Sequence, residues 1–221
     1  MRSPHIAIVG SINMDLVLRT PRMPAVGETI QGQSFHAIAG GKGANQAVAI
    51  ARQEIGATLI GCIGDDAFGQ ELHRNFIADG INTDYLFCQT GASTGVAGIF
   101  VDGDGHNSIV LAAGANQALS TTHIDSASTA ISSAALLLCQ LETPFDTVVH
   151  AITLAKQHGI PIVFNPAPMR SLDDQLLRQI DYLIINETEA SQLSGVTVSS
   201  NETAMNAAKI LHTRGSRIVL I

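Results

Sequence analysis

The sequence predicts an α/β protein built on a mostly parallel sheet, and three observations support this. Short apolar runs alternate with amphipathic helical segments along the chain. These runs are continuously apolar, as in strands buried on both faces of a sheet. Asn, Asp or Glu follows five of them, at the edge where parallel strands end. We therefore expect a three-layer α/β/α arrangement in which residues 1–221 form a single domain.

The elements follow in order along the chain. Apolar runs predict strands over 6–9, 58–63, 134–138, 160–164, 182–185 and 217–221. Helical periodicity predicts helices over 44–53, 69–78, 145–157, 187–193 and 202–213. Thr143 is expected to cap the 145–157 helix with Pro144 at its first position, and Gly159 to close it. Asn201 and Gly215 are expected to begin and end the last helix.

Two regions interrupt this alternation. Residues 15–20 and 28–31 resemble short exposed strands around a Pro/Gly turn. Residues 95–101 and 107–111 predict a hairpin through a turn at 102–105. Strands inserted at two places can form one small sheet beside the main domain. Such a sheet is either a surface hairpin or a lid that excludes water from a site.

Charge and cysteine content exclude several classes of protein. Lys and Arg number 12 against 19 Asp and Glu, a net charge of −7, so nothing indicates binding to nucleic acid or to an anionic membrane. No apolar run approaches the ~20 residues that cross a bilayer. Cys62, Cys88 and Cys139 are interpreted as small buried apolar residues in a reducing compartment, and the cytoplasm is the expected location.

Polar residues that follow the strands are the candidate ligand-binding groups. A crevice beyond the carboxyl ends of parallel strands is where such folds bind ligands. Carboxylates and amides gathered there suit a polyhydroxylated ligand better than a flat aromatic compound or a lipid. The residues concerned are Asn13, Asp15, Asp65, Asp66, Glu142, Asn165 and Asn186.

Two local motifs each allow a structural and a functional interpretation. In the functional interpretation of Ala39–Ala47, glycines let the backbone approach a ligand closely, Lys42 supplies a positive charge, and Asn45 supplies a donor and an acceptor. In the structural interpretation, the segment is a Gly-rich helix start with a solvated lysine. It is not a Walker A loop, because Gly43 follows Lys42 where Ser or Thr is required. Asn186 and Glu189 form a capping-box pattern, and they are alternatively placed near magnesium and nucleotide phosphates.

Seven motifs in order resemble the ribokinase-like (PfkB) carbohydrate kinases, from the first strand to the last residue. They are Gly10-Ser-Ile-Asn-Met-Asp15, Pro24-Ala-Val-Gly-Glu-Thr29, Gly40-Gly-Lys-Gly-Ala-Asn-Gln-Ala47, Gly64-Asp-Asp66, Gln140-Leu-Glu-Thr-Pro144, Asn165-Pro-Ala-Pro168 and Asn186-Glu-Thr-Glu189. The resemblance implies that the inserted strands, about 15–37 and 95–112, are a sugar lid that also forms a homodimer interface.

The resemblance also implies an activity and a set of site residues. The reaction is transfer of the ATP γ-phosphoryl group to the 5-hydroxyl of D-ribose, with Mg²⁺ neutralising the phosphates. Asn186 would contact the nucleotide, and Glu189 would bind the metal. The residues implied to bind the sugar are Asn13, Met14, Asp15, Gly41, Lys42, Gly43, Ala44, Asn45 and Glu142.

Two departures from the family pattern stand out. Glu54 occupies a helix exit where the family usually has glycine. The Gly-Ala-Gly-Asp run that carries the family's anion hole and catalytic base occurs nowhere in the 221 residues. We therefore expect no catalytic residue within 1–221 and a C-terminally truncated chain, with the base and the K⁺ site of the full-length parent lying beyond Ile221.

Three functions remain open from the sequence. The first is part of a kinase for D-ribose, with residues 1–221 alone inactive. The second keeps the kinase and changes the acceptor to deoxyribose, another free sugar or a nucleoside. The third, from another class, is a non-catalytic sugar-binding or dimerising fragment.

Overall fold

The computed structural model describes residues 4–221, whose main sheet has seven strands in the order β11-β10-β9-β8-β1-β4-β5. Every neighbouring pair in this sheet is parallel. This confirms the predicted fold class. The strands are β1 (His5–Val9), β4 (Gly56–Gly64), β5 (Leu86–Gln89), β8 (Leu136–Cys139), β9 (Ile162–Phe164), β10 (Tyr182–Ile184) and β11 (Ile218–Leu220).

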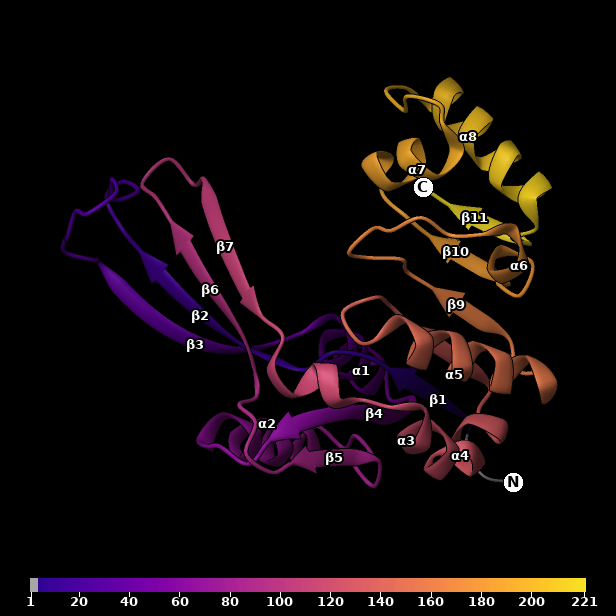
Figure 1. The fold of residues 1–221 in the computed structure, drawn as a ribbon, viewed down its shortest axis with the longest axis horizontal. Helices are drawn as coiled ribbons and strands as arrows, with labels where there is room; N and C mark the ends of the chain where they lie inside the picture. The colour runs from indigo at the N-terminus through magenta and orange to yellow at the C-terminus, as the bar shows by residue number, and fades with distance from the viewer. Residues whose placement is uncertain (1–3) are drawn as a thin grey trace.

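Helices cover both faces of this sheet (Figure 1). Ile8 of β1 packs into a core cluster with residues of α1 and α2, whereas its neighbours Ala7 and Val9 pack into a second cluster with residues of α3, α4 and α5. Successive side chains of a strand alternate between faces, so one continuously apolar strand serves both cores. The helices are α1 (Lys42–Ala51), α2 (Ala67–Ala78), α3 (Thr121–Ser126), α4 (Ser128–Ser132), α5 (Phe145–Gln157), α6 (Asp174–Leu177), α7 (Glu187–Ser194), α8 (Asn201–Arg214) and the 3₁₀ helix η1 (Gly114–Ala118).

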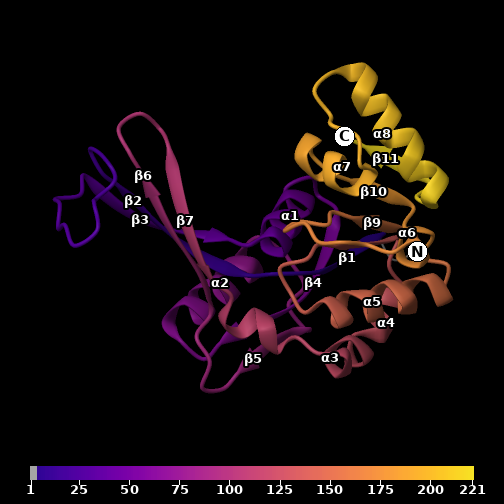
Figure 2. The same cartoon turned by 45° about the horizontal axis from the view of Figure 1, so that its top comes forward.

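A second sheet projects from the main domain on the side toward which the parallel strands point (Figures 1 and 2). We call this four-stranded sheet the lid. Its order is β3-β2-β6-β7, with β2 parallel to β6 and the other pairs antiparallel. The two inserted regions therefore form one sheet, as predicted. Its strands are β2 (Asn13–Arg19), β3 (Ser34–Gly40), β6 (Gly95–Val101) and β7 (Asn107–Ala112).

The predicted strand at 28–31 is wrong, because this segment forms a loop and the strand lies at β3 instead. The Glu28 carboxylate accepts hydrogen bonds from the Arg22 guanidinium and from the Ala25 N–H at 2.9 Å. These local bonds hold the Glu28 segment in a turn, so it does not extend into a strand.

Helix and strand ends differ from the predictions in a few places. β8 and β9 begin two residues later than expected. Ser200, not Asn201, caps α8, and its Oγ accepts from the Thr203 N–H at 3.3 Å. The N-cap of α5 is Pro144, and the Thr143 hydroxyl is buried without a hydrogen-bond partner. β5, η1, α3, α4 and α6 were not predicted, because each is too short to show a periodicity.

The three cysteines are free thiols, and their environments differ. Cys62 and Cys139 are fully buried, as expected, and burial raises the pKa of the Cys62 thiol to about 12. Cys88 is exposed, so the prediction of a buried residue is wrong there. Among the described residues, no helix combines the length and the apolar character that crossing a membrane requires.

Glu54 adopts a backbone conformation that disfavours its residue type. Its φ is 60°, in the left-handed region that glycine occupies without strain. The Glu54→Gly variant is therefore expected to raise the free energy of unfolding by about 1 kcal/mol, measured by urea denaturation. Glu54→Ala is the matched control, because it removes the exposed carboxylate and keeps the Cβ. Equal stabilisation by both variants would contradict the backbone explanation.

Candidate active site

A cavity of about 260 Å³ lies between the lid and the carboxyl ends of β1 and β8. Its floor carries the polar side chains and its roof consists of aliphatic lid residues, so it can bind polar groups and exclude water from them. Of the residues implied by the family resemblance, six line it: Asn13, Asp15, Gly41, Lys42, Asn45 and Glu142. The roof comprises Ala97, Ile99, Ile109 and Leu111.

Asn13 and Asp15 reach the cavity because they begin the lid strand β2 and are two residues apart, on one face of it. Two glycines make room for them. A Cβ on Gly95 would lie 2.2 Å from Asn13 Oδ1, and one on Gly40 would lie 2.3 Å from Asp15 Oδ2. The absence of side chains on the neighbouring strands therefore allows two polar groups at a buried strand junction.

The Asp15 carboxylate is half-buried, and its pKa is raised from the ordinary value of 3.8. Desolvation by burial is the larger cause, and repulsion by the Glu142 carboxylate is the second. A carboxylate that water solvates poorly gains more from hydroxyl donors of a ligand than an exposed one does. Asp15 is thus the strongest candidate acceptor in the cavity.

The chain between β3 and α1 turns sharply at Gly41, whose φ is 92°. A Cβ there would lie 2.7 Å from the Ser11 carbonyl oxygen, so both the conformation and the space require glycine. α1 then starts directly beneath the cavity. Two N–H groups of its first turn bind Ser11: Lys42 N–H donates to Ser11 Oγ at 2.9 Å, and Ala44 N–H to the Ser11 carbonyl at 3.0 Å.

Glu142 reaches the cavity from the segment after β8. Its carboxylate accepts from the Ser11 hydroxyl at 2.5 Å and from the Lys42 N–H at 3.3 Å. The Lys42 ammonium lies 3.7 Å from the same carboxylate. Ser11 therefore ties the start of α1 to Glu142, although Ser11 and Glu142 are 131 residues apart in the sequence.

Three other residues implied for sugar binding do not line the cavity. Met14 points into the core on the opposite face of β2 and is 1% exposed. Ala44 is also in the core, 2% exposed. Gly43 lies against the Gly10 backbone, where a Cβ would lie 2.6 Å from the Gly10 carbonyl carbon. These residues support the site from behind.

Asn186 and Glu189 lie at the end of β10, away from the cavity. They form a complete capping box on α7: Asn186 Oδ1 accepts from the Glu189 N–H at 2.8 Å, and Glu189 Oε2 from the Asn186 N–H at 2.9 Å. Asn186 is exposed and Glu189 is half-buried. The capping box leaves Oε1 of Glu189 and Nδ2 of Asn186 available to a ligand. Carboxylate oxygen is one of the ligand atoms that Mg²⁺ binds.

The remaining polar residues at the strand ends hold the backbone instead of lining the cavity. Asp66 caps α2 by accepting from the Gly69 N–H, and it accepts from the N–H and the hydroxyl of Thr94 at 2.8 and 2.6 Å. Asn165 donates to the Ile184 carbonyl. The expectation that all five strand ends contribute to one pocket is therefore met only for the positions after β1 and β8.

The structure also brings together residues that the sequence did not indicate. Ser11 is one, and Asn116, which holds Ile12 and Asn13, is another. The aliphatic roof residues are a third group. Alternation along β6 and β7 could have suggested which lid face is apolar, but nothing local showed that this face covers Asp15.

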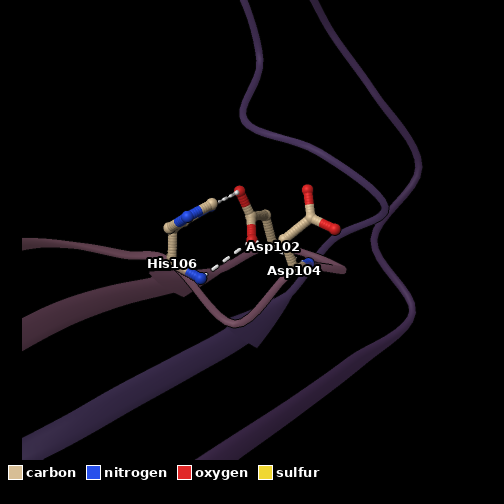
Figure 3. Close-up of side chains that lie close together, drawn as sticks. All are labelled: Asp102, Asp104 and His106. Carbon is tan, nitrogen blue, oxygen red and sulfur yellow. Dashed lines mark hydrogen bonds and ion pairs between the residues drawn. The ribbon is translucent and has the colours of Figure 1, made fainter.

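Figure 3 shows a separate group, Asp102, Asp104 and His106, at the turn between β6 and β7. The Asp102 carboxylate accepts from the His106 and Asp104 N–H groups, and the His106 imidazole lies 3.2 Å from it. Burial opposes ionisation of Asp102, but the hydrogen bonds from His106 and Asp104 outweigh it and lower its pKa. The group stabilises the hairpin turn.

The molecule is thus a parallel sheet with helices on both faces and a lid-covered cavity, lined by polar groups, beyond its first strand. The family model described as "pfkB family carbohydrate kinase" matches residues 3–221. The chain belongs to the PfkB family of carbohydrate kinases, within its ribokinase-like, ATP-dependent sugar kinases.

Relatives agree in fold and in sequence over nearly the whole chain. A ribokinase of Haemophilus influenzae is 42% identical over 216 residues, which are 98% of this chain and 71% of that protein. A deoxyribokinase of Salmonella typhi is 39% identical over 217 residues, covering 98% of this chain and 71% of its own length. The structure of Arabidopsis thaliana ribokinase complexed with ribose and ATP matches with a TM-score of 0.91 and 32% identity, covering 98% of this chain and 71% of that one.

Proposed function

We propose that this protein binds D-ribose in the cavity beneath the lid, as the acceptor for ATP-dependent phosphorylation at the 5-hydroxyl. The observation that carries the proposal is the convergence of Asn13, Asp15, Lys42, Asn45 and Glu142, from three separate segments, on one small cavity. The complex of the Arabidopsis relative with ribose and ATP supports the same ligand.

Each side chain suits a hydroxylated ligand. Asp15 and Glu142 accept hydrogen bonds from hydroxyls, and a carboxylate can accept from two vicinal hydroxyls at once. Asn45, on the first turn of α1, offers a donor and an acceptor. Lys42 is the one cationic residue of the lining, and its ion pair with Glu142 balances part of the negative charge.

The residues at the start of α7 suit a nucleotide and its metal. The start of α7 is exposed, and its first turn carries no basic residue that would pair with the Glu189 carboxylate. Glu189 therefore retains one free carboxylate oxygen for a metal. When bound, Mg²⁺ neutralises phosphate charge. In this proposal Asn186 contacts the nucleotide and Glu189 holds the metal or its water.

Calorimetric titration of residues 1–221 with D-ribose tests the binding, with D-ribulose 5-phosphate as a charged control. Saturable heat with ribose supports the proposal, and no heat from a folded protein contradicts it. A second candidate is deoxyribose, favoured by the 39% identical deoxyribokinase. Competition between ribose and 2-deoxyribose decides between them.

We also propose that residues 1–221 alone do not transfer the phosphoryl group. The family motif with the base is absent from the sequence, and the two carboxylates of the cavity are assigned to sugar hydroxyls. Mixing the chain with ribose, Mg-ATP and K⁺ should yield no ribose 5-phosphate. Turnover would show that the base lies within the chain, with Asp15 and Glu142 as the first residues to examine. Ribose binding without turnover also fits a sugar-binding fragment.

We further propose that a second copy of the chain packs on the lid. Large apolar side chains are exposed on both of its faces: Phe35 and Val110 on one, Ile38, Ile109 and Leu111 on the other. A charge on Val110, which is 71% exposed, would disrupt such an interface.

The Val110→Asp variant is expected to sediment as a monomer at concentrations where the unmodified chain is a dimer. Met205→Asp, on exposed α8, is the matched control and should leave the sedimentation unchanged. A monomeric unmodified chain, or an unaffected Val110→Asp variant, would contradict this interface.

A further inference from the structure

A buried carboxamide lies where the lid joins the main domain. Asn116 is 1% exposed and belongs to η1, which follows the last lid strand. Its Oδ1 accepts from the Ile12 N–H at 2.8 Å. Its Nδ2 donates to the Ile12 carbonyl at 2.9 Å and to Asn13 Oδ1 at 2.8 Å. Asn116 thus connects the exit of the lid to its first strand.

The direction of these hydrogen bonds follows from the backbone. An N–H can only donate, so the atom of Asn116 facing Ile12 N must be its oxygen. The amide nitrogen of Asn116 then faces the Ile12 carbonyl and the Asn13 side chain. Because this nitrogen is a donor, the Asn13 atom that faces it must be the acceptor Oδ1. The Asn13 oxygen is therefore occupied, and its Nδ2 donors are the atoms left for the cavity that Asn13 lines.

The surroundings hold Asn116 in this orientation. Its N–H donates to the Ala113 carbonyl at 3.1 Å, and the Ala115 N–H donates to the Ser93 carbonyl at 2.8 Å. A Cβ on Gly95 would lie 2.3 Å from Asn116 Nδ2, so the bare backbone of β6 encloses the amide closely. A packed, fully hydrogen-bonded carboxamide has no room to flip.

We propose that Asn116 is a positioning residue that fixes Asn13 as a hydrogen-bond donor toward the sugar. This proposal rests on the proposed function. A sugar hydroxyl has one proton and two lone pairs, so it can accept from Asn13 while donating to the neighbouring acceptor Asp15. With Asn13 reversed, the hydroxyl would meet two acceptors and could satisfy only one.

The Asn116→Asp variant tests this with almost no change in volume. One carboxylate oxygen still accepts from Ile12 N–H, but the other repels the Asn13 oxygen, and Asn13 turns its donors away from the cavity. Ribose affinity should fall about tenfold, the loss of one hydrogen bond at a site left with an unpaired acceptor. Relative to the unmodified chain at each pH, the loss should shrink as acid protonates the introduced carboxyl and restores a donor.

Two further variants separate positioning from general destabilisation. In an Asn13→Ala background, Asn116→Asp should change ribose affinity less than about twofold, because Asn116 acts through Asn13. Asn206→Asp, exposed on α8, is the charge-matched control and should bind normally. An equal loss in both backgrounds would overturn the proposal. Asn13→Asp keeps the bond to Asn116 and replaces the cavity donor by an acceptor, so unimpaired ribose binding by it would also overturn the proposal.

A measurement without sugar tests the orientation independently of the proposed function. In ¹⁵N-labelled protein, the side-chain amide protons of Asn116 should exchange with water more slowly than those of Asn13, by about 100-fold. The reverse order would show that Asn13 is not oriented as a donor. If the exchange order holds and ribose does not bind, the choice of ligand is wrong and the orientation of Asn13 stands.

Discussion

Replacing Gly43 by alanine is expected to destabilise the protein by about 2 kcal/mol. Helix propensity alone would favour alanine by about 1 kcal/mol, because Gly43 lies inside α1. Packing opposes it: the new Cβ would lie 2.6 to 2.8 Å from three backbone atoms of Gly10 and Ser11. Backbone cannot move aside as a flexible side chain does, so overpacking of about 3 kcal/mol prevails.

The same substitution is expected to weaken ribose binding, because α1 must shift away from β1. That shift separates the Lys42 N–H from Ser11 and moves Lys42 and Asn45 in the cavity. Urea denaturation measures the stability, and calorimetry measures the affinity. Gly98→Ala is the control: it lies in β6, and the nearest atom to its Cβ is 3.8 Å away. A Gly43→Ala variant as stable as Gly98→Ala would contradict the argument.

Replacing Asp15 by asparagine is expected to lower ribose affinity about 100-fold. The side chain keeps its size and position, but two charge-assisted hydrogen bonds to hydroxyls become neutral ones or are lost. Asp104→Asn, in the exposed lid turn, is the matched control and should bind ribose normally. An Asp15→Asn variant that binds ribose as tightly as the control would remove Asp15 from the site.

Acid should affect binding and stability through Asp15 in opposite directions. The folded pKa of Asp15 is above 3.8, so its carboxylate, and with it ribose affinity, is lost as pH falls through that raised value. The folded protein takes up this proton more readily than the unfolded chain. The contribution of Asp15 to the free energy of unfolding therefore rises with the same acidification. The Asp15→Asn variant should lack both effects, which calorimetry and urea denaturation at pH 4 to 8 can measure.

Much of the fold could be predicted from the sequence because its signals are local. β1 and β4 are continuous apolar runs, and α5 carries enough periodicity to give both of its ends. The prediction of a strand at 28–31 is wrong because the Glu28 carboxylate accepts hydrogen bonds from Arg22 and from the Ala25 N–H within its own loop. A charged residue bonded inside a turn and one on an exposed strand look alike in sequence.

Motif resemblance predicted six of the residues that line the cavity, whereas Met14, Gly43 and Ala44 belong to the same motifs and lie behind it. A motif marks a segment whose backbone is constrained. It does not separate side chains that face a ligand from those that pack beneath it. That distinction depends on the alternation of β2 and on the start of α1.

The sequence by itself determined the alternation of the longer strands and helices, the family, and the glycines and polar residues at the first strand end, because each is expressed within a few consecutive residues. The tertiary structure alone decided which polar groups share the cavity and in which direction they point. Glu142 meets Ser11 across 131 residues, and Asn116 orients Asn13 across 103. A hydrogen bond joins two atoms about 3 Å apart in space. The sequence separation of its two residues follows no regular pattern, so it cannot be predicted from the sequence.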